Sequence, residues 1–310
     1  MKKLYLIILL TLTIACQKQT LVSSIDCHTI IHGVGETCVP NNPQRIIALN
    51  GSAIDSLLVL DIQPVGVITN VPDLLAEKVT HIPKVGLDGT VNLEMVAKLQ
   101  PDLILGSVYS DSRIYNQLSQ IAPTVLDEGE TNGEWQKNLL FYGKVLGKQE
   151  EIKQLLQKYQ GRLVEFKQKM GSKLSQTQVS LVRVYPQQIS LYLNNSFAGS
   201  ILEDTGLSRP AFQNQGIKGK SPFQIIISRE QMSLADGDVI FLWTYGVSEQ
   251  TENSAIAQLE KLKKDPLWQQ LEAVKTNQVY QIPPYWNVPS LIAAHAVIDD
   301  LFRYLVDEKQ

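Results

Sequence analysis

The sequence predicts an α/β fold in which two doubly wound α/β lobes are bridged by one long α-helix. Short apolar runs alternate with segments of helical spacing up to residue 133, and this alternation resumes after residue 171. Strands that alternate with helices in this way form a mostly parallel sheet covered on both faces. The resulting segments are an N-terminal signal at 1–15, a tether and cysteine-bearing extension at 16–44, a first lobe at 45–133, a linking helix at 134–171 and a second lobe at 172–310.

The first fifteen residues have the pattern of a secretory signal. A charged start, Met1-Lys2-Lys3, precedes an apolar run from Leu4 to Ile14, which is shorter than the roughly 20 apolar residues that span a bilayer. Ala15 followed by Cys16 resembles a bacterial lipoprotein signal, in which the cysteine is lipidated and becomes the mature N-terminus. Thr13 stands where such signals usually carry leucine. An ordinary signal peptide that contains a cysteine is therefore the alternative.

The segment after the signal is expected to be a flexible tether and then a small extension. Residues 17–24 are polar, as linkers are. Cys27 and Cys38 are the only cysteines after Cys16. A close cysteine pair in an oxidising compartment is expected to form a disulfide, and two free thiols are the alternative.

The first lobe is predicted from strands and helices that follow one another closely. Ser52 is a good N-cap for the first helix, and Pro101 ends the second. The predicted strands are 45–50, 64–68, 102–106 and 123–126, and the predicted helices are 53–60, 91–100 and 111–121.

The linking segment has one apolar face. Helical spacing runs from Trp135 to Leu146 and then over 149–170, and Gly147 between them permits a kink or break. The second piece is about 33 Å long at 1.5 Å per residue. A rod of this kind resists bending, so we expect the lobes to close little around a ligand and the cleft to be largely preformed.

The second lobe repeats the alternation, and Gly206 is predicted to end its first helix. The predicted strands are 179–185, 189–193, 223–227, 239–243 and 279–282, and the predicted helices are 197–205, 229–235, 252–263, 267–274 and 290–306.

Several short stretches, in a specific order and spacing, cover nearly all of the chain after the signal. In the first lobe they are 43–49, 85–86, 92–94 and 98–105, and in the second they are 233–241, 265–274, 279–280 and 285–286. Together they resemble the substrate-binding proteins of ABC importers for iron–siderophores, haem and cobalamin, and most closely the ferric-siderophore members. The segment 27–40 is similar to an extension in those members.

This resemblance implies an extracytoplasmic, lipid-anchored solute-binding protein with no catalytic activity and no cofactor. Its ligand would be an Fe(III)–siderophore complex. Its protein partner would be an ABC permease dimer with its ATPase subunits, to which it would deliver the complex as a monomer. It would sit on the periplasmic side of the plasma membrane and contact the membrane through the lipid alone.

The ligand is expected in a cleft between the lobes, because ligands of open α/β sheets bind beyond the carboxyl ends of the strands. Arg183 resembles the strand arginine that siderophore-binding members use, although a structural ion pair would also explain it. The loops at these ends hold aromatic and polar residues without a cluster of metal ligands, which favours a bulky ligand. The aromatic candidates, each open to a core or cleft-rim placement, are Tyr109, Trp243, Tyr245, Tyr285 and Trp286. The further candidates are Asn50, Ser107 and Tyr185, with Arg113 as a second cation.

The resemblance also implies a contact with the permease. Family members carry one acidic residue on each lobe that meets arginines of the permease, and Glu94 and Glu230 occupy the matching positions. Two separated carboxylates would steer and orient docking. The alternative is that each is an ordinary solvated residue.

Other function classes fit less well. Loss of Lys2 and Lys3 changes the formal net charge from −3 to −5, which argues against nucleic acid as a partner. A haem or corrinoid ligand is the main alternative, with a tyrosine such as Tyr109 or Tyr245 on the haem iron. A zinc or manganese carrier would need histidines in the cleft. The four histidines are His28, His32, His81 and His295.

An anchored enzyme is the alternative from another class, but the common nucleophile and phosphate-loop motifs are absent from the sequence.

Overall fold

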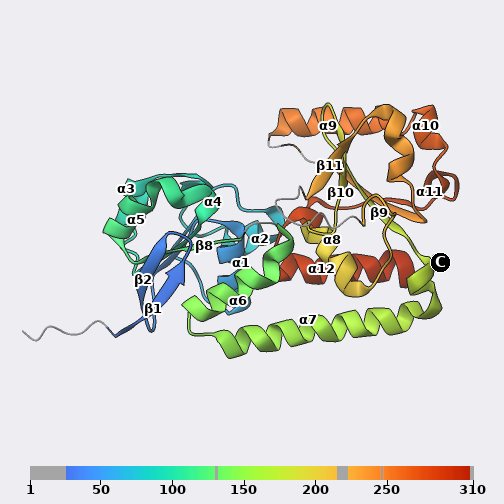
Figure 1. Cartoon of the computed structure of the whole chain (residues 1–310). Helices are drawn as coiled ribbons and strands as arrows, with labels where there is room; N and C mark the ends of the chain where they lie inside the picture. The colour runs from blue at the N-terminus through green and yellow to red at the C-terminus, as the bar shows by residue number, and fades with distance from the viewer. Residues whose placement is uncertain (1–25, 130–131, 215–222, 245, 247, 308–310) are drawn as a thin grey trace, which may run out of the picture.

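The computed structural model describes residues 26–129, 132–214, 223–244, 246 and 248–307. It shows two lobes lying side by side, with one long helix, α7, running along both of them (Figure 1). The predicted fold class is therefore confirmed. Within these described ranges, no helix has both the length and the hydrophobicity that crossing a membrane requires. The lipidation candidate Cys16 lies outside the described residues.

The first lobe is built on a parallel sheet with the strand order β4-β3-β7-β8. Its strands are short and apolar because helices cover both faces. The strands are β3 (Ile46–Ala48), β4 (Gly66–Val67), β7 (Leu103–Ser107) and β8 (Thr124–Asp127), with a small hairpin of β5 (Gly86–Leu87) and β6 (Thr90–Val91). The helices are α1 (Gly51–Val59), α2 (Asp73–Ala76), η1 (Glu77–Val79), α3 (Leu93–Lys98), α4 (Val108–Asp111), η2 (Ser112–Ile114) and α5 (Tyr115–Ile121).

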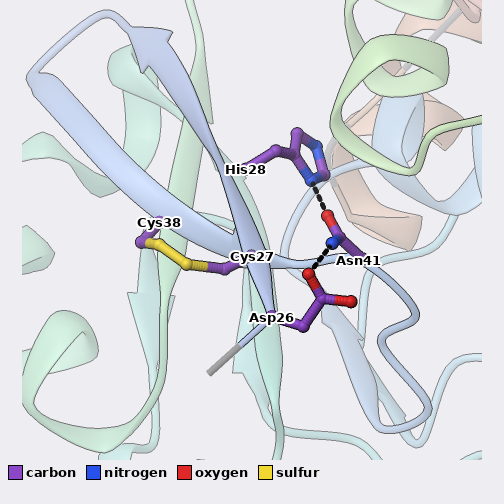
Figure 2. Close-up of a disulfide and its surroundings, with 5 residues drawn as sticks. All are labelled: Asp26, Cys27, His28, Cys38 and Asn41. Atoms are coloured by element: carbon purple, nitrogen blue, oxygen red, sulfur yellow. Dashed lines mark hydrogen bonds between the residues drawn. A yellow bond between two sulfur atoms is a disulfide. The ribbon is translucent and has the colours of Figure 1, made fainter. Parts of the chain in front are cut away.

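An antiparallel hairpin precedes this lobe, formed by β1 (Cys27–His32) and β2 (Gly35–Pro40). A disulfide joins Cys27 to Cys38 across it, with the two Cα atoms 5.6 Å apart, which confirms the predicted pairing. Figure 2 shows that Asn41 closes the open end of the hairpin: its amide donates to Asp26 at 2.6 Å, and its carbonyl oxygen lies 2.9 Å from a ring nitrogen of His28. The hairpin packs against β8.

The linking segment folds as two helices, α6 (Trp135–Val145) and α7 (Gln149–Met170), after the short η3 (Asn132–Glu134). Gly147 has a φ of +66°, so the helix breaks where the sequence predicted. A second glycine lets the two helices lie close together, because a Cβ on Gly143 would sit 2.7 Å from the Ile152 side chain.

Beyond its contact with α6, the buried face of α7 packs on the second lobe. Arg162 fixes this contact by donating to the backbone carbonyl of His295 at 3.0 Å and by pairing with Asp299. Tyr159 donates its hydroxyl to Asp204 at 2.9 Å. The buried residues of α7 are Ile152, Tyr159, Leu163, Phe166 and Met170.

The second lobe has a mixed five-stranded sheet with the order β11-β10-β9-β12-β13. The β9–β12 and β12–β13 pairs are parallel, whereas β10 runs antiparallel to both of its neighbours, β9 and β11. β10 follows β9 through a tight turn in which Tyr185 donates its N–H to Gln188 at 2.9 Å, leaving no room for a crossover helix. The strands are β9 (Val179–Val184), β10 (Ile189–Tyr192), β11 (Gln224–Ile227), β12 (Val239–Thr244) and β13 (Val279–Gln281).

The helices of this lobe follow the predicted positions with one break. The predicted helix at 267–274 is two short helices, because the Asp236 carboxylate accepts the amide hydrogens of Glu272 and Ala273 and restarts the helix there. The helices are η4 (Gly171–Gln176), α8 (Phe197–Thr205), η5 (Arg229–Ala235), α9 (Glu249–Leu262), α10 (Pro266–Gln269), α11 (Glu272–Lys275), η6 (Pro284–Asn287), α12 (Leu291–Leu301) and η7 (Phe302–Val306).

The packing of α7 predicts a large loss of stability when its core-facing side is truncated. Phe166 is fully buried and its ring centroid lies 5.4 Å from that of Phe302. We expect Phe166→Ala to lower the free energy of unfolding by about 3–5 kcal/mol, measured by urea denaturation. Val164 is 53% exposed on the same helix, so Val164→Ala should change it by less than about 0.5 kcal/mol. Equal losses for the two variants would contradict this packing.

Candidate functional site

The carboxyl ends of strands from both sheets lead into loops that meet between the lobes. The loop after β4 and the loop after β13 face each other there and enclose a cavity of about 630 Å³. A second cavity, of about 700 Å³, shares Asp73, Pro283 and Pro284 with the first. The first cavity is lined by Asn70, Val71, Pro72, Asp73, Leu74 and Glu77 of the first lobe and by Pro283, Pro284, Tyr285, Asn287, Val288 and Pro289 of the second.

The walls of the first cavity are apolar and stiff. Four of the lining residues are prolines, whose rings fix φ and limit how far the walls can move. Asp73 and Glu77 provide negative charge on the side of the first lobe, and no lysine or arginine among the described residues lines either cavity. The cavity thus combines a large apolar surface with a few polar groups, as ligand sites do.

A cluster around Arg183 lies at the carboxyl end of β9. Arg183 is only 5% exposed, and its guanidinium lies 4.3 Å from the ring centroid of Tyr185 and donates to the hydroxyl of Tyr192. Tyr185 donates its own hydroxyl to Gln224 at 2.8 Å. Burial raises the pKa of Tyr192, and the positive charge of Arg183 opposes that rise.

Trp243 completes this cluster from the neighbouring strand. It lies opposite Arg183 in the β9–β12 register, and its ring centroid is 4.8 Å from that of Tyr192. Its indole N–H is buried and has no hydrogen-bond partner among the described residues. The structure therefore brings three predicted site residues together: Arg183, Tyr185 and Trp243. Tyr245, two residues farther on, lies outside the described residues.

Asn50 and Ser107 belong to a buried network at the strand ends of the first lobe. Asn50 accepts the amide hydrogen of Ala53 at 2.8 Å and donates to Asp127 at 3.1 Å. Ser107 donates to the same carboxylate at 3.4 Å. The hydroxyl of Tyr142 also donates to this carboxylate. Burial raises the pKa of Asp127, and the hydrogen bond from Tyr142 opposes the rise. Both predicted site residues thus have partners inside their own lobe and hold its strand ends in position.

The remaining first-lobe candidates are exposed. Tyr109 is 94% exposed in α4, and Leu87, another apolar side chain on this lobe, is 51% exposed. Arg113 is exposed in η2. Tyr109 and Arg113 are therefore available to a ligand or a partner and are not part of the core.

Tyr285 and Trp286 are adjacent in sequence but have different positions. Tyr285 lines the 630 Å³ cavity, whereas Trp286 is fully buried in the core of the second lobe. Both side chains donate to the same buried carboxylate, Asp300, at 2.6 and 2.9 Å. By accepting both hydrogen bonds, Asp300 holds in position the loop after β13 that lines the cavity.

Sequence reasoning missed the first-lobe wall of the cavity. The sequence predicts the strand at 64–68, but the loop that follows its carboxyl end is not among the predicted ligand loops. Its sequence, Asn70-Val-Pro-Asp73, carries the signal: a polar residue and a proline directly after a parallel strand. Ligands of open α/β sheets bind beyond the carboxyl ends of the strands, so this loop also belongs among the expected ligand loops.

The two acidic candidates for docking lie on different lobes and are both exposed. Glu94 is in the first turn of α3, where Asn92 caps the helix by accepting the amide hydrogen of Met95 at 3.0 Å. Glu230 is in the first turn of η5, and it accepts a hydrogen bond from Ser228 at 2.8 Å. Across the described ranges, no three His, Cys, Asp or Glu side chains gather so as to hold a metal ion.

Comparisons with known proteins identify the family. The chain is 33% identical to the probable siderophore-binding lipoprotein YfiY of Bacillus subtilis, over 93% of this chain and 90% of that protein. It is 30% identical to the Fe(3+) dicitrate-binding periplasmic protein FecB of Escherichia coli, over 80% and 79%. The crystal structure of Staphylococcus aureus SirA complexed with staphyloferrin B superposes with a TM-score of 0.81 at 28% identity, covering 91% of this chain and all of that one. Residues 46–286 match the periplasmic binding protein family. These matches confirm the resemblance inferred from the sequence, and the chain belongs to the periplasmic binding protein family.

Proposed function

We propose that this protein is an extracytoplasmic solute-binding lipoprotein that captures a ferric siderophore and delivers it to an ABC permease, without catalysing a reaction. The observation that carries the proposal is the stiff cavity between two lobes in a member of this family. Relatives named as siderophore-binding support the ligand, and relatives named as lipoproteins support lipidation of Cys16.

A preassembled iron complex fits the chemistry of the described residues. In a ferric siderophore, hard oxygen donors already fill the coordination of the metal, so the protein needs no metal ligands of its own. It needs a cation and hydrogen-bond donors for the anionic outer shell of the complex. Arg183, which lies at the carboxyl end of β9 and lines neither of the two cavities, would supply the cation. The indole N–H of Trp243, which has no partner among the described residues, would be a donor beside it.

The two lobes would contribute different contacts. The Arg183 cluster and Tyr285 belong to the second lobe, while the exposed Tyr109 extends from the first. An aromatic ring on each side can pack against the flat or apolar parts of a chelator. Because the cation is on one lobe and Asp73 and Glu77 line the other, a complex would bind in one orientation.

The ligand itself is an anionic ferric complex in this proposal. Two relatives, from Bacillus subtilis and Escherichia coli, are named for binding Fe(3+)-citrate and Fe(3+) dicitrate. A buried arginine with tyrosine and tryptophan neighbours suits a carboxylate or hydroxamate complex better than a neutral ligand.

Tryptophan fluorescence quenching tests the proposed ligand class directly. The protein should be titrated with ferric citrate, a ferric hydroxamate, a ferric catecholate, haemin and cobalamin. We expect saturable quenching by at least one ferric complex, because Trp243 lies beside Arg183. Binding of haemin alone, with a shift of its Soret band, would replace the siderophore with haem. Binding of none would contradict the proposal.

Arg183 is expected to carry the charge recognition. Arg183→Ala should weaken binding of an anionic ferric complex by about tenfold to a hundredfold, and Arg183→Lys should lie between, because an ammonium lacks the planar fork of donors. Isothermal titration calorimetry measures both. Arg229→Ala is the control, since Arg229 is exposed and pairs with Asp265, and it should bind normally. Unchanged affinity in Arg183→Ala would remove Arg183 from the site.

Glu94 and Glu230 are expected to act after capture. Reversing both charges, Glu94→Arg with Glu230→Arg, should leave ligand affinity unchanged and lower ligand uptake by membrane vesicles that contain the permease by about tenfold, because docking charges govern the association rate. Glu150 is also exposed, on α7, and Glu150→Arg serves as the matched control. Equal uptake by the double variant and the control would contradict the docking role.

A further inference from the structure

Helix α12 of the second lobe begins at the interface between the lobes. Its first amide hydrogens have no partners within the helix and must be accepted from outside. Ser290 accepts the amide hydrogen of Ala293 at 2.9 Å from its own lobe. The first two amide hydrogens, those of Leu291 and Ile292, are accepted by a residue of the other lobe.

That residue is Asp55, in the middle of α1 and only 2% exposed. Its carboxylate accepts from Leu291 at 2.8 Å through one oxygen and from Ile292 at 3.2 Å through the other. A carboxylate at a helix N-terminus is also favoured by the helix dipole. Burial raises the pKa of Asp55 to about 6, and the two amides oppose the rise by stabilising the ionised form.

Other contacts surround this bond and join the same two helices. Ser52, one turn before Asp55, donates to the backbone carbonyl of Pro289 at 3.4 Å. Ile292 packs against the core of the first lobe, and Val59 and Leu60 pack against the apolar cluster that α6 and α7 share with the second lobe. The carboxylate is therefore sealed inside an apolar contact between the lobes, where water competes poorly for its hydrogen bonds.

The bond lies next to the cavity walls. The loop that ends at Ser290 contains the second-lobe wall, Pro283 to Pro289, and α1 also packs on α2 at the first-lobe wall. A shift of α12 relative to α1 would therefore change the distance between the two walls.

We propose that Asp55 is a positioning residue: by capping α12 across the interface, it fixes the spacing of the two lobes and hence the width of the cavity. Without the carboxylate, two buried amide hydrogens lose their acceptor and the interface loses its most directional contact. This proposal rests on the proposed function only in taking the cavity as the ligand site. Because the experiment uses no ligand, its failure is distinguishable from failure of the proposed function.

The interlobe distance can be measured by electron paramagnetic resonance on the full chain with Cys16→Ser, carrying spin labels at Lys98→Cys and Lys263→Cys, which are exposed positions on different lobes. The same protein is used for amide hydrogen exchange of Leu291 and Ile292. Two variants remove the cap in steps. Asp55→Asn keeps the shape and one acceptor oxygen, and Asp55→Ala removes both. Asn92→Ala is the matched control, because Asn92 caps α3 within a single lobe.

We expect a narrow distance distribution in the unaltered protein, a broader or shifted one in Asp55→Asn and the largest change in Asp55→Ala. Exchange of the two amides should accelerate by about tenfold or more, the effect of losing one strong hydrogen bond. The control should leave both measurements unchanged. The proposal is overturned if the variants keep the narrow distribution. If neither Asp55 variant folds, the unaltered protein alone decides. A broad distance distribution in it overturns the proposal, and a narrow distance distribution supports the proposal.

Discussion

The packing of α7 along both lobes is the constraint on which the rest of the structure depends. One end of the helix is locked to α6 by the close approach of Ile152 to Gly143, and its middle is held on the second lobe by Tyr159 and Arg162. A helix bends only by distorting its hydrogen bonds. The carboxyl ends of two separate sheets are therefore kept facing each other, and the loops that leave them can enclose a cavity.

Buried carboxylates recur at the joints of this structure, and each accepts hydrogen bonds from more than one group. Asp127 joins the strand ends of the first lobe, Asp300 holds the cavity loop through Tyr285 and Trp286, and Asp55 connects the lobes. A carboxylate can accept several donors at once, so a single side chain organises several segments. Directional contacts of this kind define one arrangement where apolar packing alone would permit several.

Periodicity in the sequence predicted much of the fold because local patterns determine helices. The bounds of α7 follow from apolar spacing, and α8 ends at the left-handed Gly206, as its sequence predicts. The cavity and its supports were harder to predict, since they depend on pairs far apart in the chain. Asp55 and Leu291 are one example. The prolines before Trp286 predict a loop at the cleft, yet Trp286 is buried in the core, where Asp300 in the next helix accepts its indole N–H.

The disulfide-closed hairpin has a mechanical consequence. The chain enters the fold at the open end of β1, where Cys27 is paired with Pro40. A force applied through the preceding residues would separate β1 from β2 from this end, breaking their hydrogen bonds one pair after another. The covalent bond between Cys27 and Cys38 stops that separation within the first three residues of β1. Tension on the preceding residues would then be carried through the hairpin into β8, and the pairing of β1 with β2 would be kept.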